Sequence, residues 1–218
     1  MISLFKKKPL IYGKEDMRRV EDYIQRHLGN FDEVFHELES PDIHIDIVPI
    51  PPAPGRDYLT LVTMGMGAYR MQIPSQFTNY VKNKYYRAEL AIRLPGNWDT
   101  HSRDDSWFWP FRVLYSLARL PLTENSWLGL AHTVDFGSTV TDLVGFSGFL
   151  LDFLIHDDSL PVRLTAGDGV LMYNVVPIYP EEMALKVATN AQTLMERLGP
   201  DILSAPVDIH RVNRCRTD

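Results

Sequence analysis

Residues 42–71 read DIHIDIVPIPPAPGRDYLTLVTMGMGAYRM, and this stretch decides the fold. Its first part, residues 43–47, alternates isoleucine with polar residues, a period of two that sends one set of side chains into a core and the other outward. A proline cluster at 51–54 stiffens the connection that follows. Residues 58–66 are then apolar at nearly every position, as in a central strand covered on both faces. The stretch therefore predicts strand, stiff turn and strand.

Further strands are indicated by alternating or continuous apolar runs, of which residues 86–94 form the cleanest. The predicted strands outside the hairpin are 31–38 (an edge strand), 86–94, 127–136, 144–155 and 170–178, with a hairpin turn at Gly167–Gly169 before the last of them. We expect a mixed, mostly antiparallel sheet, because residues 86–94 carry one apolar and one largely polar face.

Helices are indicated by apolar residues spaced three and four apart. They are predicted over residues 14–28, 110–120 and 180–198, with Pro121 ending the second, and residues 72–84 are predicted to form a surface loop. The predicted fold class is therefore α+β, a sheet flanked by helices.

The composition is that of an ordinary globular domain, with 45% apolar and 23% charged residues among 218. We expect one domain over residues 1–218, with a core over about 14–200 and a charged tail over 201–218. The net charge of −6 argues against nucleic acid as a partner. A single cysteine and the lack of a signal peptide or an apolar run of about 20 residues favour a cytoplasmic protein without a membrane segment.

Sequence motifs for catalysis are absent. The chain has no glycine-rich nucleotide-binding or phosphate loop, no His-Glu-x-x-His, no paired cysteines and no Gly-x-Ser-x-Gly elbow. The seven histidines, at positions 27, 36, 44, 101, 132, 156 and 210, lack the spacing of metal ligands. Cys215 lies in a terminal tail without rigid surroundings. We expect no catalytic residue, no metal and no cofactor.

Polar side chains on the predicted strands are the candidates for a functional surface. If the strands are neighbours, the following side chains converge on one face: His44, Asp46, Arg87, Glu89, Arg93 and His132. Three interpretations remain open. The face binds a protein or peptide, or it is a solvated surface with ordinary cross-strand pairs, or it holds a metal ion or an acid/base hydrolase that uses His44, Asp46, Glu89 or His132.

Several short segments, in order and at similar spacing, resemble the suppressor of fused family over about residues 30–200. They are Ile45–Pro49, Thr60–Met66, Arg87–Leu90 with Leu94-Pro95, Trp109-Pro110 with Leu117–Arg119, Trp127–Gly129 with His132-Thr133, and Val176–Tyr179 with Glu181-Glu182.

The resemblance implies a non-enzymatic binding module of mixed α/β architecture. Animal members hold a zinc-finger transcription factor of the Hedgehog pathway by gripping an extended peptide between two domains, and shorter bacterial relatives include immunity proteins that neutralise a toxin. This chain resembles the short form, so we expect an immunity-type protein partner and not the two-domain clamp. A homo-oligomer is compatible with the sequence. The expected partner-binding residues are His44, Asp46, Tyr69, Arg87, Glu89, Arg93 and His132.

Overall fold

A seven-stranded mixed sheet forms the centre of the computed structural model, which describes residues 8–137, 144–155 and 161–216. The strands are β1 (Asp46–Ile50), β2 (Tyr58–Met64), β3 (Arg87–Pro95), β4 (Thr133–Asp135), β5 (Gly148–Phe153), β6 (Val162–Arg163) and β7 (Gly169–Ile178). Their order is β1-β2-β3-β7-β5-β4, with β6 paired to β7. Strands β3 and β7 run parallel, and the other neighbouring strands of the described sheet pair antiparallel. The predicted α+β class is confirmed.

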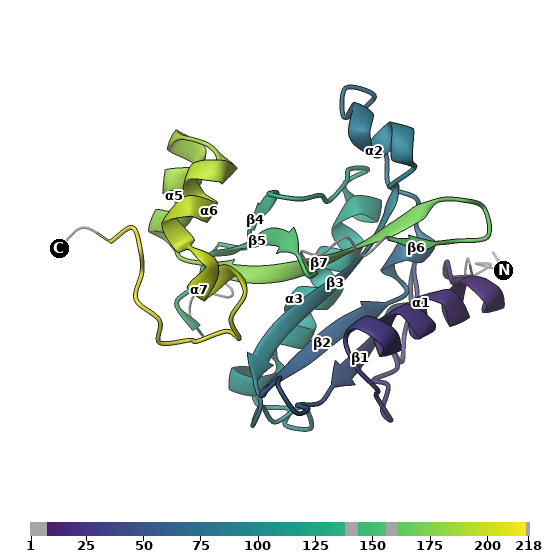
Figure 1. The fold of residues 1–218 in the computed structure, drawn as a ribbon, viewed down its shortest axis with the longest axis horizontal. Coiled ribbons are helices and arrows are strands. Elements are labelled where there is room, and N and C mark those ends of the chain that lie inside the picture. Colours follow the sequence, from purple (N-terminus) through teal and green to yellow (C-terminus); the bar gives the residue numbers. More distant parts are fainter. Residues whose placement is uncertain (1–7, 138–143, 156–160, 217–218) are drawn as a thin grey trace, which may run out of the picture.

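Helices cover both faces of this sheet (Figure 1). They are α1 (Lys14–His27), α2 (Thr78–Asn83), α3 (Asp105–Thr123), α5 (Pro180–Ala188), α6 (Ala191–Leu198) and α7 (Pro200–Leu203), with a short 3₁₀ helix, η1 (Met66–Ala68), after β2. Figure 1 shows α1 and α3 on opposite sides of β1 and β2, and α5, α6 and α7 grouped near the end of β7. None of the helices in the described ranges is both long and apolar enough to cross a bilayer.

Two separate cores result from this layering. Val20 and Ile24 of α1 pack with Val48 and Val62 on one face. On the other face α3 packs against β1, β2 and β3, and its Leu117 is fully buried. A third apolar cluster lies under α6, where Leu194 is also fully buried. Leu117 and Leu194 thus fix their helices in the core.

The expectation of a polar, solvated sheet face is wrong. Asp46 and Glu89, predicted to point outward from their strands, are 5% and 0% exposed. The reason is that connecting segments cover them: Asp46 contacts His36 and the Glu37 amide, and Glu89 contacts the Tyr12 hydroxyl and the amides of the turn after β2. Alternation along a strand separates its two faces but does not say which of them another element covers.

The hairpin that opens the sheet has the predicted form. Ala53 and Arg56 exchange two backbone hydrogen bonds of 2.8 Å each in the proline-rich turn, with Gly55 at a φ of 82°. Directly after β2, Gly65 has a φ of 139°, and a Cβ there would lie 2.2 Å from the carbonyl oxygen of His44. Only glycine fits at this close approach of two backbones.

Three predicted elements differ from the structure in the N-terminal half. Residues 31–38 form no strand, and only Phe35 makes an isolated bridge, with Ile47. The loop predicted at 72–84 contains α2. Helix α3 begins at Asp105, before the predicted start at Pro110. It continues through Pro121 to Thr123, because a proline removes only one hydrogen bond close to the end of a helix.

Two further differences lie in the C-terminal half. The strand predicted over 127–136 is reduced to β4, and β5 spans only residues 148–153 of the predicted 144–155. The helix predicted over 180–198 is two helices, since Asn190 accepts a hydrogen bond from the Thr193 amide and caps the start of α6. Val187, near the end of the first of these helices, is 76% exposed. The strand β7 and the turn at Gly167 are confirmed.

Candidate functional site

Glu89 is the most buried of the seven expected partner-binding residues, and the residues around it hold it inside the fold. Its Oε1 accepts hydrogen bonds from the Tyr12 hydroxyl at 2.7 Å and from the amides of Gly65 and Gly67 at 3.0 Å each. Its Oε2 accepts from the Thr63 hydroxyl at 2.6 Å. Burial raises the pKa of Glu89, and these four donors oppose that shift only in part. Glu89 thus joins the N-terminal segment to the turn after β2.

The raised pKa of Glu89 predicts a pH-dependent stability. Because the folded state retains this proton to a higher pH than the unfolded state, whose pKa is near 4.5, the contribution of Glu89 is complete below pH 4.5 and is lost as pH rises through the folded value. Urea unfolding from pH 4 to 7 should show the stability of the wild type falling relative to Glu89→Gln. A difference between the two proteins that stays constant or grows in the other direction would contradict the raised pKa.

Arg87 and Arg93 are also engaged within the fold. Arg87 Nε lies 2.9 Å from Asp168 Oδ2, and its Nη1 donates to the carbonyls of Gly67 and Ala68 at 2.8 Å each. Arg93 donates to two main-chain carbonyls on other elements, at residues 154 and 204. Both arginines therefore tie the sheet to the segments beside it.

Tyr69 and His132 lie on other parts of the surface layer. Tyr69 follows η1 and packs, half-buried, against the main core. His132 stacks edge-on with Trp127 at 4.3 Å between ring centroids, and burial lowers its pKa. The expected seven residues thus do not form one surface, and only His44 and Asp46 are brought into contact.

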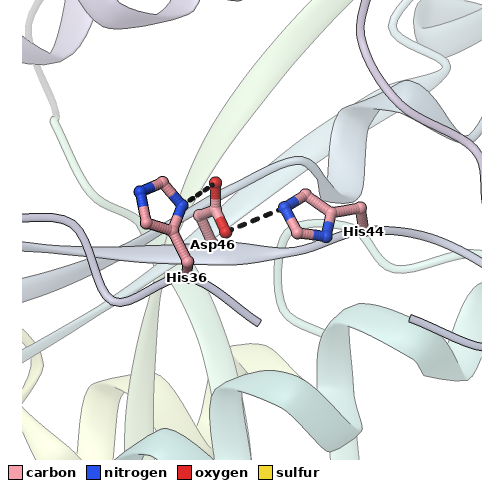
Figure 2. A group of neighbouring side chains, drawn as sticks. All are labelled: His36, His44 and Asp46. Atoms are coloured by element: carbon pink, nitrogen blue, oxygen red, sulfur yellow. Dashed lines mark hydrogen bonds and ion pairs between the residues drawn. The ribbon is translucent and has the colours of Figure 1, made fainter. Parts of the chain in front are cut away.

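His44 and Asp46 belong to a compact cluster with His36 (Figure 2). Figure 2 shows the Asp46 carboxylate lying between the two imidazole rings. His36 Nδ1 lies 3.2 Å from Asp46 Oδ2, and His44 Nε2 lies 3.0 Å from Asp46 Oδ1. The side chain of Asp46 is 7% exposed, that of His44 29% and that of His36 69%. The cluster therefore has a buried carboxylate and one side open to solvent.

The position of His36 follows from the bridge between Phe35 and Ile47. The Phe35 amide donates to the Ile47 carbonyl at 2.8 Å, and the Ile47 amide donates to the Phe35 carbonyl at 3.1 Å. This reciprocal pair places the next residue, His36, beside Asp46. The Glu37 amide also donates to Asp46 Oδ1 at 3.2 Å and fixes the carboxylate.

Glu37 links the cluster to α3. Its Oε2 accepts from the Ser40 hydroxyl at 2.8 Å, and Ser40 Oγ lies 2.7 Å from His44 Nδ1. Its Oε1 pairs with Arg119, which also lies 3.2 Å from Asp42 Oδ1. Residues 37–46 are thereby held against the helix.

The local field of this cluster is negative. Burial, together with the negative charges of Glu37 and Asp46, raises the pKa of the Tyr115 hydroxyl on α3 to about 12. The two carboxylates thus hold the Tyr115 hydroxyl in its neutral form, and Tyr115 also lines a neighbouring groove.

A groove of about 660 Å³ adjoins the cluster, between the 35–38 segment, the loop at 100–105 and α3. Its floor is aromatic, since Phe111 packs with Phe35 at 5.1 Å and with Phe108 at 5.2 Å between ring centroids. Leu38 at its rim is 97% exposed. An apolar floor with a polar rim is the form of a site that takes an extended or apolar ligand.

The series Ser40, His44, Asp46 has the residue types of a hydrolase triad but not its proton arrangement. In a triad the serine hydroxyl donates to the histidine. Here the Ser40 hydroxyl donates to the Glu37 carboxylate, so it accepts from His44. Glu89 and His132, the other candidates of a catalytic interpretation, have their own separate partners. The arrangement does not activate a nucleophile.

Sequence reasoning missed His36, Glu37, Ser40 and Arg119. Histidine spacing gave no signal, because His36 reaches Asp46 through the bridge at Phe35 and not through a helical or strand repeat. Arg119 was noted only as the last residue of one segment in the family resemblance. The acidic character of residues 33–39 was the one available signal.

A mixed sheet covered by helices on both faces, with an aromatic groove beside one edge, defines a domain of the α+β class. The particular family is also clear. The chain belongs to the suppressor of fused family, because the sequence model described as Suppressor of fused protein (SUFU) matches residues 41–215.

Similar proteins agree with this family assignment. The uncharacterized protein UU111 of Ureaplasma parvum is 24% identical over 203 residues, covering 92% of this chain and 96% of that protein. A suppressor of fused homolog from Neisseria gonorrhoeae has a similar fold, with a TM-score of 0.63 at 17% identity over 94% of this chain and 100% of that one. A chain of the Sufu-Fu complex has a TM-score of 0.61 at 13% identity over 95% of this chain and 93% of that one.

Proposed function

We propose that this protein is a non-enzymatic binding module that takes an extended segment of a protein partner in the groove beside α3. The observation that carries the proposal is the aromatic floor of that groove together with Leu38, which is 97% exposed at its rim. Burial of such an exposed aliphatic side chain against a partner contributes favourable binding free energy, at about 25 cal/mol per Å² of apolar area.

The geometry favours an extended peptide over a small polar substrate. Phe35, Phe108 and Tyr115 are only partly buried, so their rings are accessible from the groove. Charged side chains of both signs, including Asp105 and Arg112, stand at its rim. Aromatic anchors inside a polar rim are the usual composition of a protein interface.

Family membership supports a binding role, and one structural neighbour was solved as part of the Sufu-Fu complex. We further propose that the partner is a toxin and that the chain is an immunity-type protein of the cytoplasm, because the sequence resembles the short members of the family. The single cysteine fits a reducing compartment. His44 and Asp46 remain in the proposed site because they position the rim residues 36–38.

Capture of the partner from the native cells tests the proposal. Tagged wild type should retain a specific protein, identified by mass spectrometry, and Leu38→Asp should weaken its binding at least about tenfold, or about 1.4 kcal/mol. The change places a charge on the groove rim without touching the core, since Leu38 is exposed.

Val187→Asp is the matched control, because Val187 is also an exposed aliphatic residue but lies on α5. It should bind the partner as the wild type does. Equal affinity of Leu38→Asp and the wild type would exclude the groove, and loss of binding in Val187→Asp alone would place the interface on the α5 side. Neighbouring genes that encode a toxin would support the immunity role, and a metabolic operon would oppose it.

A further inference from the structure

The protons of the His44 side chain can be assigned from its neighbours. The Ser40 hydroxyl has one proton, and it lies 2.8 Å from Glu37 Oε2, where an ionised carboxylate paired with Arg119 can only accept. Ser40 therefore accepts at its other contact, and His44 Nδ1, at 2.7 Å, must be the donor. A neutral His44 consequently has no proton on Nε2.

This assignment leaves two lone pairs facing each other. His44 Nε2 lies 3.0 Å from Asp46 Oδ1, and both atoms are acceptors when the ring is neutral. Such a contact is repulsive unless a positive charge lies between the two atoms. That charge is either a proton or a metal ion that both atoms ligate.

The metal ion accounts for more of the arrangement. Two ligand atoms that each lie about 2.1 Å from a tetrahedral ion are about 3.4 Å apart. His44 Nε2 lies 3.0 Å from Asp46 Oδ1, close to that value, whereas His36 Nδ1 contacts the other oxygen, Oδ2, at 3.2 Å; one ligand atom from each of the three residues lies within 4.8 Å of the others. The His36 side chain is largely exposed, so its ring can turn toward an ion held by His44 and Asp46. The solvent-facing side of the cluster leaves room for a water as the fourth ligand.

The surroundings are those of a prepared ligand set. A histidine that ligates a metal usually donates its other ring N–H to a carboxylate, directly or through a neighbour, and His44 does so through Ser40 to Glu37. The Glu37 amide holds the Asp46 carboxylate from the side. Each ligand that is buried is therefore oriented before any ion arrives.

The charge balance points the same way. Glu37, Asp42 and Asp46 are three carboxylates, and Arg119, paired with the first two, is the fixed cation among them, so two negative charges remain. A divalent cation would balance them. Since Asp46 is 7% exposed, its charge is costly without such a partner.

We infer that His36, His44 and Asp46 bind a divalent transition-metal ion of the zinc type, through Nδ1, Nε2 and the carboxylate respectively. Two imidazoles and one carboxylate suit zinc and its neighbours better than calcium or magnesium. The ion would fasten the 36–46 segment to β1 and so fix the rim of the groove. This inference does not rest on the proposed function, because the site binds the ion whatever occupies the groove.

Titration of tag-free, chelator-treated full-length protein with Zn²⁺ tests the inference. Calorimetry should show saturable binding of one ion per chain, and the thermal midpoint should rise with added Zn²⁺. His36→Ala should weaken binding at least tenfold while keeping the unliganded fold, since its side chain is mostly exposed. His101→Ala, an exposed histidine on the other side of the groove, should bind as the wild type does.

Nitrogen-detected NMR of the rings separates the two sources of positive charge. Zn²⁺ should shift the Nε2 signal of His44 and the Nδ1 signal of His36 together. Saturable binding that His36→Ala leaves unchanged would overturn the inference. So would a proton on His44 Nε2 that persists at saturating Zn²⁺, because the proton would then occupy the position assigned to the metal.

Discussion

Replacement of Glu89 by alanine is expected to destabilise the protein by about 4 kcal/mol or more, because each buried donor left without an acceptor costs about 1–3 kcal/mol. Four donors lose their acceptor at once, from Tyr12, Thr63, Gly65 and Gly67. A loss of this size approaches the whole stability of a typical domain, about 5–15 kcal/mol. Urea unfolding, or the yield of folded protein if the variant does not fold, measures it.

Glu89→Gln is the informative companion of this variant. Its amide oxygen can accept from Tyr12 and from the two glycine amides, which all bond to Oε1 in the wild type. Its NH₂ group can donate to Thr63, whose hydroxyl can turn to accept. We therefore expect Glu89→Gln to stay close to the wild type in stability near pH 4.

Replacement of an exposed carboxylate is the control for these stability measurements. Glu196→Ala removes an exposed side chain that accepts a hydrogen bond from Gln192, and it should change the stability by less than about 0.5 kcal/mol. If Glu89→Ala also lost less than about 1 kcal/mol, the hydrogen bonds around Glu89 would not contribute as argued here.

The sequence predicted the opening hairpin and the strands β3 and β7 well because their patterns are local. Ile43, Ile45 and Ile47 are all fully buried, as their period of two indicates, and the hairpin follows from the proline-rich turn. The helix predicted over residues 14–28 from apolar spacings of three and four is α1, which ends one residue earlier, at His27. Each of these elements depends on residues within a few positions of one another.

Polar residues could not be placed by the same reasoning. The strand pattern places Glu89 on a solvated face, because its hydrogen-bond donors lie 22 to 77 positions away in the sequence. His36 meets Asp46 only because one bridge forms where a full strand was predicted. Tertiary contacts of this kind leave no period in the sequence.

The C-terminal segment illustrates the same limit. Residues 201–218 were predicted as a charged tail outside the core, and positions 217 and 218 lie outside the described residues. Arg211 in this segment holds Glu182, which is 0% exposed, with contacts of 2.7 Å to Oε1 and 2.5 Å to Oε2. The Tyr179 and Arg214 amides also donate to Glu182. The segment is thus fastened to the start of α5.

Breaking this ion pair gives the second large effect. Arg211→Met is expected to cost about 3–5 kcal/mol, because it leaves the buried Glu182 carboxylate without its cation. Arg214→Met is the matched control, three residues further on, where the arginine pairs with Asp201 and the two side chains are 43% and 62% exposed. Its cost should be about 0–1 kcal/mol, as for other exposed ion pairs.

Thermal or urea unfolding of both variants measures the contrast. The double variant Arg211→Met with Glu182→Gln should recover part of the loss, since no unpaired charge then stays buried. If the two single variants were equally stable, the segment after α7 would contribute little to the fold, and Glu182 would have to be stabilised by the amides of residues 179 and 214 alone.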